Sequence, residues 1–300
     1  MGETNLLDIN SQLGQWMPRG QSYPAGLYLV ATPIGNMADI TLRALWVLQL
    51  ADVILCEDTR VSRKLLNNYG INARLLAYHE HNAATMRDTV LEFLAAGKRV
   101  ALVSDAGTPL ISDPGYRIVV DAYEQGHYVT SLPGASSVTL ALTLAGLPTD
   151  RFLFAGFLSS KQQARQQQIN ELALIPATLV LLEAPHRIAA ALAALAHTMP
   201  DRSAAIAREL TKRHEEIRKG SVAELAEHYK NHGAPKGEIV IVIAPPAKVA
   251  VATDSATLDQ YIYQGLENES VKALSTRLSS ELGLPRKHIY DRAVELKNHG

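Results

Sequence analysis

The 300-residue sequence has a single cysteine, Cys56, which excludes a disulfide framework and any metal site built from several thiolates. No run reaches the roughly 18 uninterrupted apolar residues that a membrane span needs, and residues 1–21 lack the cationic head and apolar core of a signal peptide. Strong net charge is absent as well: the formal value is -1, so binding to a polyanion would need a local patch. These absences predict a cytoplasmic protein with no membrane association.

Familiar ligand-binding signatures are also missing. No Gly-x-Gly-x-x-Gly follows the first predicted strand and there is no Gly-Lys-Ser/Thr, so a nicotinamide or nucleoside-triphosphate site is not expected. The histidines do not have metal-ligand spacing, because His79 and His81 lie two apart while His186 and His214 stand alone. No tightly held metal is expected.

A regular alternation of strand and helix patterns is what the sequence does contain. Apolar runs predict strands over residues 26–31, 53–56, 75–78, 99–103 and 127–132, each followed by an amphipathic helix. This alternation predicts an α/β fold with a mainly parallel sheet. After Asp150 a second series begins, with strands predicted over 152–155, 177–182, 203–207 and 237–244.

The predicted organisation has four parts. They are a poorly ordered start over 1–25, an α/β domain over 26–148, a second α/β domain over 149–247, and a helical extension over 258–298. The extension has two short helices around a Gly turn, similar to a helix-turn-helix, and residues 271–300 carry a net charge of +3. A small helical cap with a solvated face explains this segment equally well.

The predicted strands end in loops rich in Gly, Pro, Ser and acidic residues. The longest is Ser104-Asp-Ala-Gly-Thr-Pro-Leu-Ile-Ser-Asp-Pro-Gly115, and similar loops occur at 32–36, 133–137, 183–187 and 245–246. Ligands bind at the carboxyl ends of strands in parallel α/β sheets. These loops therefore predict a cofactor recognised by shape and main-chain hydrogen bonds, in a cleft between the two domains.

The loop sequences also carry a resemblance. Thr32-Pro-Ile-Gly-Asn36 with Ile40-Thr-Leu-Arg43, and Pro133-Gly-Ala-Ser-Ser137 with Ala145-Gly-Leu-Pro148, resemble segments of the tetrapyrrole methylase superfamily of S-adenosylmethionine-dependent methyltransferases. Within it, four stretches are similar to the bacterial 16S ribosomal RNA (cytidine-2'-O)-methyltransferase family: the 104–115 loop, Glu57-Asp-Thr-Arg60, His79-Glu-His-Asn82 and Arg208-Glu-Leu-Thr-Lys212. The C-terminal helices look like that family's helix-turn-helix extension.

The resemblance implies two tetrapyrrole-methylase-like α/β domains with a cleft between them, assembled as a homodimer. It implies methyl transfer from S-adenosylmethionine to the ribose 2'-hydroxyl of a cytidine in 16S rRNA of the small ribosomal subunit. The implied cofactor contacts are Pro33, Ile34, Asp105, Gly107, Leu110, Ser136 and Ser137, with Leu182, Ala207 and Pro245 from the second domain. The implied catalytic residues are Glu57, Arg60 and Lys212, and the implied substrate contacts are Asp58, His79, Arg187, Arg208 and Glu209.

Two departures from the wider superfamily affect the cofactor contacts. The first loop is typically Gly-x-Gly-Pro-Gly there, whereas Pro33 and Ile34 stiffen it here. The central loop usually carries Gly-Asp-Pro, and Ala106-Gly107-Thr108 stands at that place, which leaves Asp105 as the nearest acid.

Several alternatives stay open at this point. The general base is one of Glu57, Asp58, His79 or Glu209, and Lys212 either contacts phosphates or stabilises an alkoxide. The stretch 57–60 is alternatively a helix N-cap with a surface ion pair, and 208–216 a solvated charged helix. The alternative functions are methylation of a small tetrapyrrole and regulation by nucleic-acid binding through the terminal helices.

Overall fold

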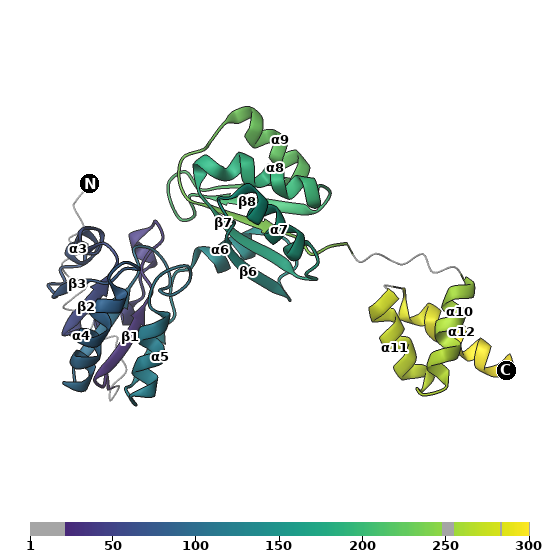
Figure 1. Ribbon diagram of the computed structural model, residues 1–300, viewed down its shortest axis with the longest axis horizontal. Helices are drawn as coiled ribbons and strands as arrows, with labels where there is room; N and C mark the ends of the chain where they lie inside the picture. The colour runs from purple at the N-terminus through teal and green to yellow at the C-terminus, as the bar shows by residue number, and fades with distance from the viewer. Residues whose placement is uncertain (1–21, 248–254, 283, 300) are drawn as a thin grey trace, which may run out of the picture.

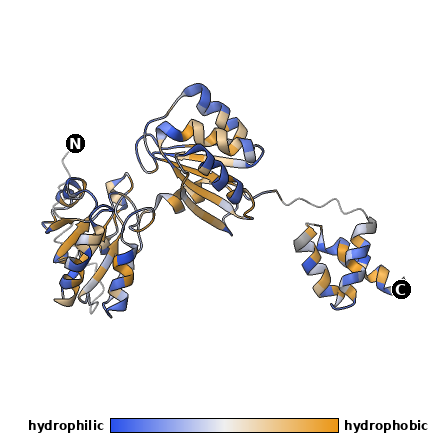
Figure 2. Cartoon of the chain, viewed as in Figure 1, coloured by the Kyte–Doolittle hydropathy of each residue, from blue (hydrophilic) through white to orange (hydrophobic). Residues whose placement is uncertain are grey.

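The computed structural model describes residues 22–247, 255–282 and 284–299. Its elements form two α/β parts, each with its own sheet, followed by a group of C-terminal helices (Figure 1). Most of the predicted poorly ordered start, residues 1–21, lies outside the described residues. The strands are predominantly apolar and lie inside both α/β parts, while polar residues mark the outer helix faces (Figure 2).

The first sheet is entirely parallel, as the strand–helix alternation predicts. Its five strands have the order β3-β2-β4-β1-β5. They are β1 (Gly26–Val30), β2 (Val53–Cys56), β3 (Leu75–Ala77), β4 (Arg99–Val103) and β5 (Val129–Leu132). The connecting helices are η2 (Met37–Asp39), α2 (Leu42–Leu50), α3 (Thr59–Asn68), α4 (Ala83–Ala95) and α5 (Tyr116–Glu124).

Both faces of this sheet are covered. Side chains alternate between the faces of a strand, so Tyr28 and Val30 pack with α2 and α3 while Leu27 and Leu29 pack with α4 and α5. Burial on both sides explains why the strands read as continuous apolar runs. It also leaves the carboxyl-terminal edge as the place where polar loops can gather.

The second sheet is mixed, with the order β6-β7-β10-β8-β9. Its strands are β6 (Phe152–Phe157), β7 (Thr178–Glu183), β8 (Ser203–Arg208), β9 (Glu216–Ser221) and β10 (Ile239–Ile243). Only β6 and β7 pair in parallel; β10 is antiparallel to both β7 and β8, and β8 is antiparallel to β9. β9 was not predicted from the sequence, because its residues Glu-Ile-Arg-Lys-Gly-Ser are mostly polar.

The two faces of the second sheet are covered from different parts of the chain. One face packs against α7 (Gln162–Ala173), α8 (Ile188–Thr198) and α9 (Val222–His232), with η3 (Pro185–Arg187) before α8. The other face packs against α6 (Ser137–Ala145), which directly follows β5 of the first sheet. Figure 1 shows α6 at the junction between the two α/β parts. The domain boundary at 148–149 stays a prediction, and the helix before it packs on the second sheet.

The C-terminal part consists of α10 (Ser255–Leu266), α11 (Val271–Leu282) and α12 (Arg286–His299). They share a core of Leu258, Ile262, Leu274, Leu278, Leu282, Ile289, Ala293 and Leu296. Because α10 belongs to this core, the charge of the folded unit differs from that of 271–300 alone: residues 255–299 hold six Lys or Arg and six Asp or Glu. Arg277 pairs with Glu269 at 2.8 Å and Arg292 with Asp259 at 2.6 Å.

We expect Leu274→Ala to unfold these three helices while both sheets stay folded. Leu274 is fully buried in their shared core, and truncating a buried leucine costs roughly 2–5 kcal/mol, a large fraction of the stability of so small a unit. Hydrogen exchange read by mass spectrometry should show lost protection over 255–299 alone. Lys272→Ala, an exposed change on the same helix, is the control. Lost protection in β1–β10 would contradict the independence of this core.

Candidate functional site

A cavity of about 600 Å³ lies where the two α/β parts meet, and we call it the central cavity. The first part contributes residues from the loops after β1 and β4 and the start of α6. The second contributes the end of β7, the turn after β8 and the start of β10. Its apolar walls are Ile34, Ile111, Phe157, Leu182, Ile239 and Val240. Its polar and charged lining includes Ser112, Asp113, Ser137, Glu183, Glu209, Lys212 and Glu238.

Strand direction decides which end of each strand reaches this cavity. In the first sheet, carboxyl-terminal loops reach it, as predicted. β10 runs antiparallel to β7, so its amino-terminal residues 237–240 line the cavity instead. Pro245, which follows the other end of β10, lines a separate cavity with Met199 and Arg202. The prediction that Pro245 walls the cofactor site therefore does not fit this sheet.

The backbone is strained in the two loops that line the central cavity. Among the described residues, the non-glycine positions with positive φ are Leu110 (72°), Ser112 (68°), Glu209 (51°) and Thr211 (65°). Such a φ is rare for a residue with a side chain and especially unfavourable for β-branched Thr. Strain of this kind persists where surrounding packing imposes it, and it clusters at functional sites. Here it falls in the loop 104–115 and the turn 209–215.

The first loop and the turn 209–215 hold each other in place. The Asn36 amide donates a hydrogen bond to Thr211 Oγ1 at 3.0 Å. Gly35 has no room for a side chain, because a Cβ there would lie 2.5 Å from Lys212 Cγ. The contact joins one loop from each α/β part and brings Lys212 to the wall of the cavity.

Lys212 is held as an ammonium group by two carboxylates. Its Nζ lies 2.9 Å from Glu209 Oε1 and 3.3 Å from Glu238 Oε2. Burial by itself lowers the pKa of Lys212, but the hydrogen bond to Glu209 and the charges of both carboxylates outweigh it and raise the pKa. The hydrogen bond from Lys212 in turn lowers the pKa of Glu209. This pair therefore provides a fixed cation, and Glu209 is a poor proton acceptor.

Asp113 is a site residue that the sequence reasoning missed. It lines the central cavity near the end of the 104–115 loop. Burial raises the pKa of Asp113 to about 6, the charge of Glu57 adds to the rise, and a hydrogen bond with Ser104 opposes it. Its only signal in the sequence is that it is the second acid in this loop. A carboxyl group that titrates near neutral pH is suited to taking up a proton.

A second cavity, of about 470 Å³, lies at the carboxyl ends of β2 and β3, and we call it the strand-end cavity. It brings together five predicted residues: Glu57, Asp58, Arg60, His79 and Asp105. Two of them have structural roles, as the helix-cap alternative predicts. Asp58 is the N-cap of α3 and accepts from the Arg60 amide at 2.8 Å, while the Arg60 guanidinium, largely exposed, pairs with it at 2.6 Å.

Asp58 is also unsuited to act as a base. Hydrogen bonds from the Arg60 side chain and amide lower the pKa of Asp58 to about 2. Its own amide donates to Asp105 Oδ1 at 3.2 Å, which ties the start of α3 to the 104–115 loop. Glu57 and His79 remain candidates in the strand-end cavity.

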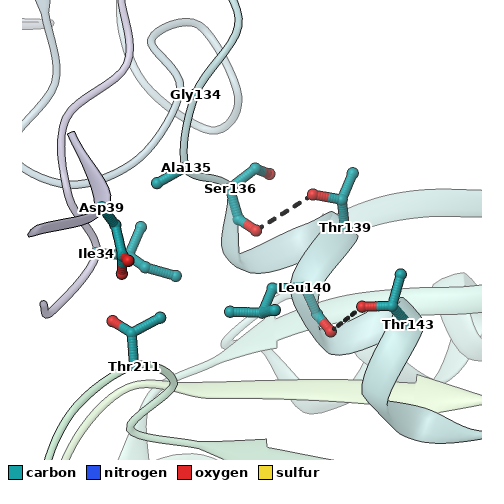
Figure 3. Close-up of a pocket in the computed structure, with 9 residues that line it drawn as sticks. All are labelled: Ile34, Asp39, Gly134, Ala135, Ser136, Thr139, Leu140, Thr143 and Thr211. Carbon is teal, nitrogen blue, oxygen red and sulfur yellow. Dashed lines mark hydrogen bonds between the residues drawn. The ribbon is translucent and has the colours of Figure 1, made fainter. Parts of the chain in front are cut away.

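The two predicted serines divide between neighbouring cavities. Ser137 lines the central cavity, and Ser136 lines a third one of about 400 Å³ that is drawn in Figure 3. Thr139 Oγ1 donates to the Ser136 carbonyl at 3.3 Å in the first turn of α6. Ile34 lines both cavities and is the predicted cofactor contact that joins them.

Other predicted residues lie outside these cavities. Gly107 exchanges two backbone hydrogen bonds with Thr32, at 2.9 and 3.0 Å, and so joins the loop after β1 to the loop after β4. Pro33, next to Thr32, is buried. Leu110 packs on the core of the first sheet, and Ala207 is buried beneath α6. Arg187 pairs with the buried Glu183 at 3.1 Å and donates to the Leu158 carbonyl. Arg208 lines a separate pocket, where it binds Glu216 at 2.9 Å.

Two further properties concern the described part of the chain. Within 22–247, 255–282 and 284–299, no helix combines the length and apolar character needed to cross a bilayer. In the same ranges, His, Cys, Asp and Glu side chains do not gather in threes that could hold a metal ion.

Comparison with known proteins decides the family. The tetrapyrrole (corrin/porphyrin) methylases match residues 26–226. A protein of Mesorhizobium japonicum named ribosomal RNA small subunit methyltransferase I is 47% identical over 273 residues, covering 91% of this chain and 92% of its own. A protein of the same name from Erythrobacter litoralis is 46% identical over 272 residues, covering 91% and 95%. The chain belongs to the ribosomal RNA small subunit methyltransferase I family.

The fold of this methyltransferase family also occurs in solved structures. Uroporphyrin-III C-methyl transferase from Thermus thermophilus, complexed with S-adenyl homocysteine, matches with a TM-score of 0.52 and 19% identity. The match covers 72% of this chain and 96% of that one. The two α/β parts described above thus share the tetrapyrrole methylase fold.

We expect Asp113→Asn to stabilise the protein at pH 8. The pKa of Asp113 is about 6 in the folded chain, above the ordinary aspartate value of 3.8, so ionisation destabilises the folded state as pH rises through this range. Allowing for solvent screening, the free energy of unfolding should rise by on the order of 1–2 kcal/mol at pH 8. This increase should shrink as pH falls from 6 towards 4. Urea unfolding at several pH values measures it, with the exposed Asp88→Asn as the control. A gain that does not depend on pH would contradict the assignment.

Proposed function

We propose that this chain transfers a methyl group from S-adenosylmethionine to the ribose 2'-hydroxyl of a cytidine in 16S rRNA of the small ribosomal subunit. The observation that carries the proposal is the near-full-length similarity to proteins named ribosomal RNA small subunit methyltransferase I. The same similarity does not favour methylation of a small tetrapyrrole or a regulator without enzymatic activity.

The central cavity fits the cofactor in size and in chemistry. Its volume of about 600 Å³ is in the range of small-molecule sites. Ile34, Leu182 and Val240 offer apolar surface to a flat ring, and Ser137 adds a polar contact. The lining has four carboxylates (Asp113, Glu183, Glu209 and Glu238) but only one ammonium group, which favours a ligand with positive charge. When bound, S-adenosylmethionine supplies an activated methyl group on a positively charged sulfur.

The chain's own residues would handle the proton and the developing charge of the acceptor. A ribose hydroxyl is weakly acidic, so a positioned base accelerates its attack by roughly 10²–10⁴-fold. Asp113 is the base we propose: its carboxylate takes the 2'-hydroxyl proton, and its pKa of about 6 leaves it mostly ionised at neutral pH. Lys212 Nζ would donate a hydrogen bond to the negative charge that develops on the acceptor oxygen.

The remaining elements of the proposal concern assembly and location. The resemblance supports a homodimer that acts on the small ribosomal subunit, and the single cysteine supports a reducing compartment such as the cytoplasm. Glu57 and His79, in the strand-end cavity beside the 104–115 loop, would contact the RNA that reaches the central cavity. In this proposal Arg60 and Asp58 shape the start of α3, and Arg187 supports the end of β7 through Glu183.

The direct test is incubation of the protein with small ribosomal subunits that lack the modification and with S-adenosylmethionine labelled on its methyl group. Label should appear in 16S rRNA, and mapping should place it on the ribose of a cytidine. Label on a base, or none in RNA, would overturn the proposal.

We expect Lys212→Met to lower kcat on small subunits by about 10²–10³-fold, because a half-buried donor to developing charge is lost. The affinity for S-adenosylmethionine, measured by calorimetry, should change by less than about tenfold, since the cavity walls remain. Lys98→Met, at the opposite edge of the first sheet, is the matched control and should retain full activity. Unchanged kcat in Lys212→Met would remove this residue from the mechanism.

A further inference from the structure

A fourth pocket, of about 400 Å³, lies at β9, the edge strand of the second sheet, and we call it the β9–α9 pocket. It is formed by the end of β8, by β9, by one face of α9 and by the connection to β10. Its lining consists of Arg208, His214, Glu216, Arg218, His228, Tyr229, His232, Gly233, Pro235 and Lys236. None of these residues lines the central cavity.

Positive charge is in excess in this pocket. The Glu216 carboxylate binds two guanidinium groups, with Arg208 Nη2 at 2.9 Å from Oε2 and Arg218 Nη2 at 2.6 Å from Oε1. One anion thus faces two arginines and Lys236, before any histidine is counted. Arg218 Nε is buried and has no hydrogen-bond partner among the described residues, while the Arg218 side chain as a whole is 41% exposed. Arginine is the side chain best suited to phosphate oxygens.

Flat rings lie beside these cations. His228 and His232 stack with their centroids 4.1 Å apart and an angle of 20° between the rings. Burial, together with the charge of Arg218, lowers the pKa of His228, so the ring is neutral at neutral pH. Aromatic rings next to arginines are typical of surfaces that bind single-stranded RNA, where bases stack and phosphates pair with cations.

The pocket is close to the central cavity along the chain. His214 lines the β9–α9 pocket and Lys212 lines the central cavity, so one short turn separates the two sites. Two residues of extended chain span at most about 7 Å. A strand of RNA with a ribose in the central cavity would therefore bring a phosphate within a few nucleotides to the β9–α9 pocket.

We propose that the β9–α9 pocket binds a backbone phosphate of the rRNA strand whose ribose is methylated, through Arg218 and Lys236. The inference rests on the proposed function, because it takes RNA as the substrate. Arg208 acts indirectly here: it holds Glu216 and donates to the Lys236 carbonyl at 3.1 Å, which fixes the pocket wall. The pocket thus positions RNA and does not take part in methyl transfer.

The test compares wild type, Arg218→Gln/Lys236→Gln and the single variant Lys236→Gln. Binding to unmodified small subunits is measured by filter retention over a range of salt concentrations without cofactor, and kcat and KM by methyl transfer. Lys230→Gln is the matched control, because Lys230 is an exposed lysine on α9 that pairs with Glu227 and does not line the pocket.

We expect the double variant to bind about 10-fold more weakly and its slope of log affinity against log salt to fall by about 1, because fewer counterions are released. KM should rise while kcat at saturation and cofactor affinity stay unchanged, and Lys230→Gln should behave as wild type. If Arg218→Gln disturbs folding, Lys236→Gln alone should still reduce the slope. If the double variant methylates rRNA with an unchanged salt slope and KM, the proposed role of the pocket in phosphate binding is wrong, while the proposed function of the protein stands. Failure of wild type to methylate rRNA would overturn the proposed function, while the slopes still report on the pocket.

Discussion

The packing of α6 on the second sheet is the interaction on which the site depends. β5 pairs within the first sheet, yet the helix that follows it buries Val138, Ala141 and Leu142 against the second sheet. Only residues 133–136 separate the two elements, so the carboxyl edge of the first sheet is held directly against the other α/β part. Ile34 from the first loop packs into the same apolar cluster. The central cavity has walls from both parts because this one core joins them.

The strained turn at 209–215 depends on the same packing between the two α/β parts. Glu209 and Thr211 have positive φ angles, and holding a residue in this conformation costs of order 1–3 kcal/mol each. A loop without supporting contacts would not keep these angles. Contacts on both sides stabilise the turn: the Asn36 amide bonds Thr211, and the Glu238 amide bonds Glu209 Oε1 at 3.2 Å. Gly237 allows this approach, since a Cβ there would lie 2.1 Å from Glu209 Oε1. The result is an ammonium group fixed in position before any ligand arrives.

Local patterns in the sequence predict the first half of the molecule well and the second half less well. Alternating apolar strands and helices imply parallel pairing, which places loop ends at one edge. Ile34, Ser137 and Asp105, which the family resemblance implies as cofactor contacts, lie in or next to these loops and line cavities. Antiparallel pairing of β10 leaves no such local signal, so the sequence does not indicate that Pro245 lies at the end of β10 away from the central cavity. Polar β9 at the sheet edge was missed for a similar reason, because edge strands need few apolar residues. Asp113 could not be distinguished from a turn residue, since its altered pKa arises from burial and from Glu57, which is distant in sequence.

The central cavity and the β9–α9 pocket lie on either side of the turn 209–215 and differ in charge. In the central cavity, carboxylates outnumber ammonium groups, and this suits a cationic cofactor but would repel a polyanion. In the β9–α9 pocket, Arg208 neutralises the one carboxylate, Glu216. The positive charges of Arg218 and Lys236 are then in excess, and this suits phosphate. Under the proposed function, an RNA strand would therefore gain its affinity outside the central cavity, with only one ribose entering. Residues 255–299 carry balanced charge, so the C-terminal helices, like the α/β surface beside the cavity, would add to RNA affinity through a local patch and not through net charge.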